Sequence, residues 1–152
     1  MITAVLFVLQ MACPQHDHAM DHRGDQAMGF SQHAAKHTFR LLRDGGAIEV
    51  RANDGKDAKS VDAIREHLRT IAMSFAEGDF ATPMFIHDRM PDGAKEMKEL
   101  RGAIAYRYEE VPNGGRVRIT TKDARALDAV HRFLTFQIEE HQTGDSKEIE
   151  RP

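Results

Sequence analysis

Residues 37–52 read HTFRLLRDGGAIEVRA, two short apolar runs separated by the turn-forming sequence DGG at residues 44–46. Aspartate followed by glycine adopts the positive φ angles of a tight turn at little cost, so this stretch predicts a β-hairpin. In the second run Ile48 and Val50 alternate with charged residues, a period of two that is typical of a strand with one buried face. This hairpin is central to the predicted fold, because the second half of the chain contains the same pattern.

The next stretch, residues 60–80, reads SVDAIREHLRTIAMSFAEGDF and predicts a long amphipathic helix. Its apolar residues recur at intervals of three and four, which places them on one face. They are Val61, Ile64, Leu68, Ile71 and Phe75. Ser60 is the expected N-cap and Gly78 the expected C-terminal stop.

The second half of the chain repeats this plan. Residues 103–121, AIAYRYEEVPNGGRVRITT, predict a second hairpin, and residues 122–145, KDARALDAVHRFLTFQIEEHQTGD, predict a second helix. The apolar stripe of this helix is Leu127, Val130, Leu134 and Ile138. The glycine pair of the second hairpin follows that of the first by 69 residues, whereas the helices are 66 residues apart. The pattern indicates an internal duplication of a ββα unit with a shorter second loop.

A single hairpin is marginally stable, and each helix needs an apolar surface to cover. The sequence therefore predicts an α+β two-layer sandwich: a four-stranded antiparallel sheet with both long helices on one face. Residues 81–102, between the two units, are expected to form a loop with a short helix around 94–100. We place the folded domain at residues 36–146 and expect a disordered C-terminus at 147–152.

The composition is that of a soluble globular protein, with 41% hydrophobic and 30% charged residues and a net charge of −3. No basic stripe is present, so a nucleic-acid partner is not expected. One cysteine excludes an internal disulfide and any multi-cysteine metal site. No nucleophile elbow, phosphate loop or HExxH motif occurs, so binding is favoured over catalysis, and an enzyme is left open.

Residues 1–13, MITAVLFVLQMAC, are an apolar run followed by small residues and a cysteine. The run is too short to span a bilayer and resembles the leader of a secreted protein or of a lipoprotein. A buried N-terminal strand of a cytosolic protein is the alternative. We expect a periplasmic or secreted protein, or one anchored by a lipid at Cys13, with no other membrane association.

Residues 14–35 are expected to form a flexible tail rich in histidine and methionine, because the segment has too little apolar content to build a core. Imidazole together with thioether sulfur suits copper, since methionine favours Cu(I), whereas zinc would need only the histidines. The candidate ligands in this tail are His16, His18, Met20, His22 and Met28. A solvated tether without metal is the alternative.

Further histidines lie close to the apolar faces of the predicted elements. The candidates are His37, His67, His87 and His131. Each by itself is more typical of a satisfied core or border residue, but together they predict a ligand pocket or metal site between the sheet and the helices. We expect at least one pair to meet, above all His67 with His131. Met84 and Met90 flank His87 as further soft groups, or they fill gaps beside a short buried strand.

Three long phrases carry a resemblance to a known group of proteins: GFSQHAAKHTFRLLRDGGAIEV, FIHDRMPDGAKEMKELRGAIAYRYEE, and GGRVRITT with the later HRFLTFQIEEHQTGD. They are similar to a family of uncharacterised exported bacterial proteins, whose members commonly carry a Met/His-rich segment before the GF pair. The resemblance covers Met28 to Asp145. It implies export and a metal association, and it brings no activity.

The sequence thus predicts a periplasmic protein that binds or sequesters a metal ion, with copper preferred and zinc as the alternative. Two other functions stay open. One is a small-molecule or haem binding domain with a pocket between sheet and helices, and the other is a histidine-based metal-dependent enzyme. A homodimer is also left open.

Overall fold

The predicted strands pair into one antiparallel sheet. The computed structural model describes residues 18–151, so the predicted leader, the first residues of the tail and Pro152 lie outside the described residues. The strands are β1 (Ala35–Leu42), β2 (Gly45–Ala52), β3 (Ile104–Val111) and β4 (Gly114–Thr121), in the sheet order β1-β2-β4-β3. Two hairpins therefore lie side by side and join through their second strands.

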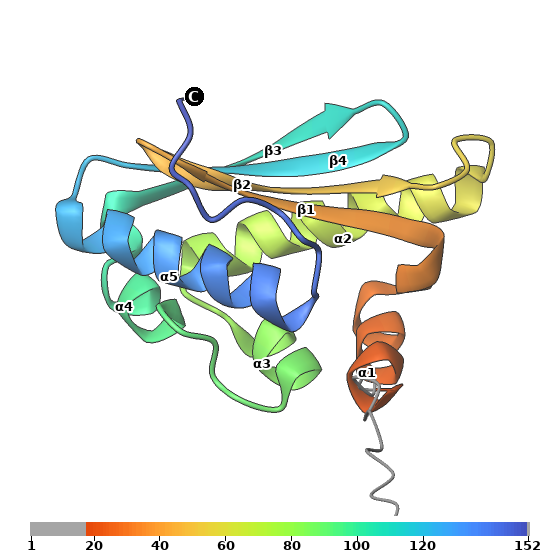
Figure 1. Cartoon of the computed structure of the whole chain (residues 1–152), viewed down its shortest axis with the longest axis horizontal. Helices are drawn as coiled ribbons and strands as arrows, with labels where there is room; N and C mark the ends of the chain where they lie inside the picture. Colours follow the sequence, from red (N-terminus) through yellow and green to blue (C-terminus); the bar gives the residue numbers. More distant parts are fainter. Residues whose placement is uncertain (1–17, 152) are drawn as a thin grey trace, which may run out of the picture.

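The two long helices, α2 (Ala58–Glu77) and α5 (Ala124–Glu140), cover the same face of this sheet (Figure 1). The predicted α+β sandwich is confirmed. Helix α2 begins earlier than expected, because Asp57 is its N-cap and accepts a hydrogen bond from the backbone N–H of Ser60. It ends, as predicted, at Gly78, whose φ of 78° favours glycine.

The strand register follows the duplication. Ile48 pairs with Val117 at the middle of the β2–β4 ladder, and these two residues occupy equivalent positions in the two units. On either side, Gly45 pairs with Thr120 and Arg51 pairs with Gly114. The same positions therefore pair reciprocally, as a local two-fold axis between the hairpins requires.

Each long helix packs mainly against the hairpin of the other unit. Helix α2 lies over β3 and β4, while α5 lies over β1 and β2. A Cβ atom at Gly46 would lie 2.1 Å from Leu134 Cδ1, and one at Gly115 would lie 3.1 Å from Leu68 Cδ1. The glycine pairs, predicted as turn residues, instead begin β2 and β4 and let the helices approach; residues 43–44 and 112–113 form the turns.

The second helix is buried more widely than its predicted stripe. Val130, Leu134 and Ile138 are buried as expected, but Leu127 is only partly buried and Phe133 is 1% exposed. Phe133 packs against the rings of Phe75 in α2 and of Phe80, and α4 (Ala94–Glu99) covers another part of α5 on the side away from the sheet. This short helix confirms the one predicted around residues 94–100.

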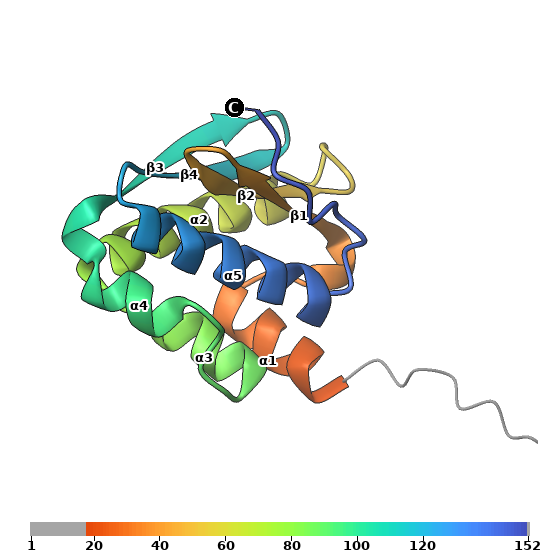
Figure 2. The same ribbon diagram turned by 60° about the vertical axis from the view of Figure 1, so that its left-hand side comes forward.

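Another short helix, α3 (Ala81–His87), precedes α4 where a loop or a short buried strand was expected. Together with α4 and α1 it forms a further layer beneath the long helices (Figure 2). Met84, Phe85 and Met90 remain exposed in this region, while Ile86 is buried. The expected gap-filling role of the two methionines is therefore wrong.

The segment before β1 differs from the flexible tail expected over residues 14–35. Residues His18–Met28 form helix α1, and Met20 and Met28 are buried together with Phe30. Arg23 Nε donates a hydrogen bond to the carbonyl oxygen of Ile86 at 2.9 Å, which attaches α1 to α3. The few apolar side chains of this segment suffice because they meet an existing apolar surface rather than each other.

The C-terminal residues also differ from the disorder expected over 147–152. The backbone N–H of Glu150 donates to the carbonyl oxygen of Leu41 at 2.8 Å, and its carboxylate forms an ion pair with Arg40. The chain end therefore covers the free edge of β1, which offers unpaired backbone groups. No helix within residues 18–151 is long and apolar enough to cross a membrane.

Candidate functional site

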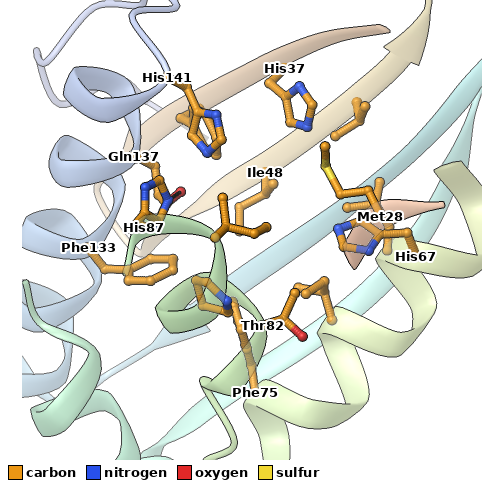
Figure 3. A pocket seen from close by; sticks show the side chains of 16 residues that line it. Met28, His37, Ile48, His67, Phe75, Thr82, His87, Phe133, Gln137 and His141 are labelled. Atoms are coloured by element: carbon orange, nitrogen blue, oxygen red, sulfur yellow. Dashed lines mark hydrogen bonds between the residues drawn. The ribbon is translucent and has the colours of Figure 1, made fainter. Parts of the chain in front are cut away.

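A small cavity lies between the sheet and the long helices (Figure 3). Its volume is about 60 Å³. Apolar side chains from the sheet, α2, α3 and α5 form most of its wall, and the thioether side chain of Met28 adds to it from the end of α1. Four histidines from four different elements complete the lining: His37, His67, His87 and His141. We call this space the inner cavity.

Each histidine reaches the inner cavity for a local reason. His37 alternates with Phe39 in β1 and so lies on the covered face of the strand. His67 lies at the inner border of α2, where it is partly buried. His87 is the last residue of α3, and His141 caps the C-terminal end of α5.

Three of the four imidazoles form a contiguous group. The rings of His37 and His141 are stacked, with centroids 5.5 Å apart and planes 7° apart. The ring of His87 meets that of His141 edge-on, with centroids 5.0 Å apart. Phe30 contacts both His37 and His67, at centroid distances of 6.3 and 5.9 Å. His67 therefore belongs to the same lining but is separated from the other three imidazoles.

Burial keeps these imidazoles neutral. Desolvation lowers the pKa of His37 to about 4. Desolvation, together with the smaller effect of the His37 ring, lowers the pKa of His67 to about 4 as well. Desolvation, assisted by two neighbouring imidazoles, lowers the pKa of His141 to about 3. Desolvation also lowers the pKa of His87, against the opposing effect of its hydrogen bond with Gln137. At neutral pH all four rings are in the uncharged form, which is the form that binds metal ions.

Two buried polar atoms of the lining have no hydrogen-bond partner among the described residues. His87 and Gln137 are 7% and 5% exposed, and His87 Nε2 lies 3.2 Å from Gln137 Oε1. Because an amide oxygen only accepts, Nε2 carries the proton and Nδ1 keeps a free lone pair. His87 Nδ1 and Gln137 Nε2 are the atoms without a hydrogen bond, a potential acceptor and a potential donor at the same wall. The carboxylate of Glu140 lies nearby, with its Oε2 3.7 Å from His87 Nδ1, beyond hydrogen-bond distance. Such groups are costly when left unpaired, which favours a ligand at this wall.

Three of the four histidines predicted for the folded domain thus line one cavity, but His131 does not. Its Nε2–H donates to the carbonyl oxygens of Leu42 and Gly45, at 2.9 and 3.0 Å, at the turn between β1 and β2. The expected meeting of His67 with His131 is therefore wrong. The structural reason is that His131 lies on the face of α5 that meets the turn between β1 and β2, whereas Phe133, Gln137 and His141 line the inner cavity.

Replacing His131 with alanine is expected to lower the free energy of unfolding by about 1–3 kcal/mol, because two buried carbonyl groups lose their donor. Urea unfolding followed by circular dichroism measures the change. The exposed His22 offers the control, since its replacement by alanine should change stability by no more than about 0.5 kcal/mol. Equal stabilities of the two variants would show that the bond from His131 contributes nothing.

The predicted ligands of the tail are divided by helix α1. His16 lies outside the described residues, and His18 is the first residue of the helix. Met20 is buried in the core and Met28 lines the inner cavity, whereas His22 is exposed. In an extended chain, His16, His18 and His22 would lie on the same side. Residues 18–28 form a helix instead, and a helix distributes its side chains around its axis.

Three residues of the lining or its surroundings lie outside the predicted candidate set. His141 follows the buried Ile138 by three positions, and this spacing on a helix was the available signal. Gln137 and Phe30 had no comparable signal. A glutamine on an amphipathic helix is expected on the exposed face, and Phe30 lies in a stretch without a regular apolar pattern. Their placement depends on contacts between distant parts of the chain.

Among residues 18–151, no three side chains of histidine, cysteine, aspartate or glutamate are arranged to hold one metal ion. The nearly parallel rings of His37 and His141 show why, since two imidazoles that share an ion must direct one nitrogen each at the same point. Rotation of at least one ring would be needed to form such a point. The predicted roles as metal ligands stay predictions.

No protein-family model, no curated protein and no solved structure matches the chain. The fold and the cavity define an α+β protein built of two ββα units, with a histidine-lined space between its layers. Export and the family resemblance stay predictions.

Proposed function

We propose that this protein binds a copper ion, as Cu(I), in the inner cavity and sequesters it or hands it on. The observation that carries the proposal is the contiguous group of three neutral imidazoles, His37, His87 and His141, in an enclosed space of about 60 Å³. A neutral imidazole is a ready metal ligand, and no proton has to leave before it binds.

The ring separations support this function. A histidine nitrogen binds a metal at about 2.0–2.1 Å, so the ring centroid lies about 3 Å from the ion. Two imidazoles on one ion then have centroids about 5–6 Å apart, depending on the bond angle. The observed 5.5 Å between His37 and His141 and 5.0 Å between His87 and His141 lie in this range. Side-chain rotation, without movement of the backbone, would aim the nitrogens at one point.

The choice of copper over zinc rests on the chemistry of the lining. Among the described residues, the lining of the inner cavity contains imidazoles and the thioether of Met28 but no carboxylate and no cysteine. The carboxylate of Glu140 lies outside the lining, with its Oε2 3.7 Å from His87 Nδ1. Thioether sulfur is a soft ligand that favours Cu(I). A structural zinc site would ask for four ligands in a tetrahedron, usually including cysteine. The predicted export of the chain accords with a role in metal handling, and like that role it is a proposal.

The test is a Cu(I) titration under anaerobic conditions, in competition with a chromophoric chelator. We expect one tightly bound ion per chain, and His37→Ala and His141→Ala should each weaken binding by at least about tenfold, since even outer partners of metal ligands have effects of that size. His131→Ala is the matched control, because it removes an imidazole that does not line the inner cavity and is hydrogen-bonded to the turn between β1 and β2. Circular dichroism checks that each variant is folded.

Two results would contradict the proposal. Unchanged affinity in both cavity variants would place the ion elsewhere, for instance on His16 and His18 of the predicted tail. A higher affinity for Zn(II) than for Cu(I), measured by the same kind of competition, would favour the zinc alternative.

A second candidate function is supported by the unpartnered atoms, His87 Nδ1 and Gln137 Nε2. A small organic molecule with one donor and one acceptor could pair with both. The volume of about 60 Å³ restricts it to a few heavy atoms, since pockets for drug-sized ligands measure about 300–1,000 Å³. Haem, the larger alternative, is not favoured for this reason. Native mass spectrometry of the purified protein distinguishes the two functions by the mass that it retains.

A further inference from the structure

A second, larger hollow adjoins the inner cavity on the side of β1 and of the chain that follows α5. Its volume is about 350 Å³, and we call it the outer cleft. Polar side chains line it, and several of them are exposed to solvent. The polar residues of its lining include His33, Lys36, Asn53 and Thr143. The outer cleft therefore differs from the inner cavity in being polar and open.

The two spaces share a wall. His37 and His141 line both the inner cavity and the outer cleft, so the stacked pair of rings separates them. His37 is held within β1, where it pairs with Val50 across the sheet. His141 lies at the end of α5, and the next residue, Gln142, has a positive φ of 49° that turns the chain away. His141 is therefore the member of the pair with more freedom to rotate.

Among residues 18–151, partly exposed polar side chains occur on two sides of the inner cavity. One is the wall formed by His37 and His141, and the other is formed by His67 and Thr82 between α2 and α3. The remaining residues of the lining are buried. A solute that enters or leaves must pass one of these two sides.

The side of the outer cleft offers more to a cation. His33 is exposed there, and its Nε2 lies 3.7 Å from Asp21 Oδ2. The carboxylate of Asp145 accepts hydrogen bonds from Thr143 Oγ1 and from the backbone N–H of Phe39. Asp21 and Asp145 do not line the outer cleft themselves, but each contacts a residue that does, His33 and Thr143 respectively. The positive charge of Lys36 opposes the attraction of these carboxylates for a cation. The effect of this charge must therefore be separated from the effect of bulk added at the same position.

We propose that the outer cleft is the entrance through which a metal ion reaches the inner cavity. The ion first meets His33 and then the paired rings of His37 and His141. Rotation of His141 transfers the ion to the inner side, where His87 is the next imidazole. This inference rests on the proposed function, because it assigns a route to the same ion.

The test compares rates rather than affinities. Cu(I) is supplied as a weak complex with a chromophoric chelator, and stopped-flow absorbance measures how fast the full-length protein removes it. Lys36→Trp fills the outer cleft at an exposed position, and Lys36→Gln removes the same charge without filling it. Thr70→Trp adds the same bulk on the other side, at an exposed position of α2 three residues after His67 that does not belong to the lining of the inner cavity. The natural chain has no tryptophan, but the chelator signal does not depend on protein fluorescence.

We expect Lys36→Trp to slow Cu(I) uptake at least tenfold while changing the equilibrium affinity less than threefold, because release slows with uptake. Lys36→Gln should bind as fast as the natural chain or faster, and Thr70→Trp should leave the rate unchanged. An unchanged rate in Lys36→Trp, with copper still bound, overturns the entrance but not the proposed function. Slower uptake in Thr70→Trp alone places the entrance on the side of α2. Absence of Cu(I) binding by the natural chain overturns both proposals.

Discussion

Alanine in place of Leu68 or Leu134 is expected to lower the free energy of unfolding by about 2–5 kcal/mol, the range observed for fully buried leucines. The two side chains are 1% and 0% exposed. Each fills the space left by a glycine in the hairpin of the other unit, Leu134 at Gly46 and Leu68 at Gly115. Urea unfolding followed by circular dichroism measures the loss, which should be similar for the two variants because their surroundings are equivalent.

Met73→Ala is the matched control for these variants. Met73 belongs to α2, as Leu68 does, but it is 62% exposed, so its loss should change stability by no more than about 0.5 kcal/mol. Unfolding of the natural chain should be a single transition, since each long helix covers the other unit's hairpin and neither unit can lose its structure alone. Losses in both leucine variants as small as the control would show that the inward faces are misassigned.

Acidification of the metal-free protein from pH 7 to pH 5 is expected to lower its free energy of unfolding by several kcal/mol. In the fold the pKa is about 4 for His37 and His67 and about 3 for His141, against an ordinary value of 6.5. The unfolded chain therefore takes up protons first, and stability is complete above about pH 6.5 and decreases toward pH 4. At pH 5 each of these histidines lowers the stability by about 2 kcal/mol.

Thermal melting at pH 7, 6 and 5, in the presence of a metal chelator, measures this effect. His37→Leu and His141→Leu should each flatten the dependence on pH, whereas His22→Gln, at an exposed histidine, should not alter it. The pKa of Glu109 is lowered by its hydrogen bond with Arg116, so the stability that this carboxylate contributes is lost only below its ordinary value of 4.5, outside this window. A melting temperature that stays constant from pH 7 to pH 5 would mean that water reaches the rings of the inner cavity.

The duplicated ββα plan was predictable because its signals are local. The alternation of Ile48 and Val50 and the spacing from Ile64 to Leu68 depend only on the geometry of one strand and one helix. The same local reasoning assigned turn residues to the glycine pairs, and there it was wrong. Gly46 is needed because Leu134, far away in the sequence, approaches the strand at that point.

The inner cavity was predictable only in part. His37, His67 and His87 lie next to apolar positions, so their inward direction could be inferred one element at a time. On α5 the choice between His131 and His141 could not be made in this way, since both lie near the apolar stripe. They differ in which part of β1, β2 and α3 lies against each of the two positions, and the apolar pattern of a helix does not specify that.

The sequence by itself therefore determined the strands, the long helices, their apolar faces and the α+β class, because each of these follows from the order of polar and apolar residues within a short stretch. The tertiary structure alone decided the exchange of helices between the units, the packing of α1 and of Glu150, and the meeting of His37, His87 and His141. These features depend on which apolar faces pack against each other. That choice is made by shape and by the fit of particular side chains over long distances in the chain, and the hydrophobic effect that drives the packing has no direction of its own.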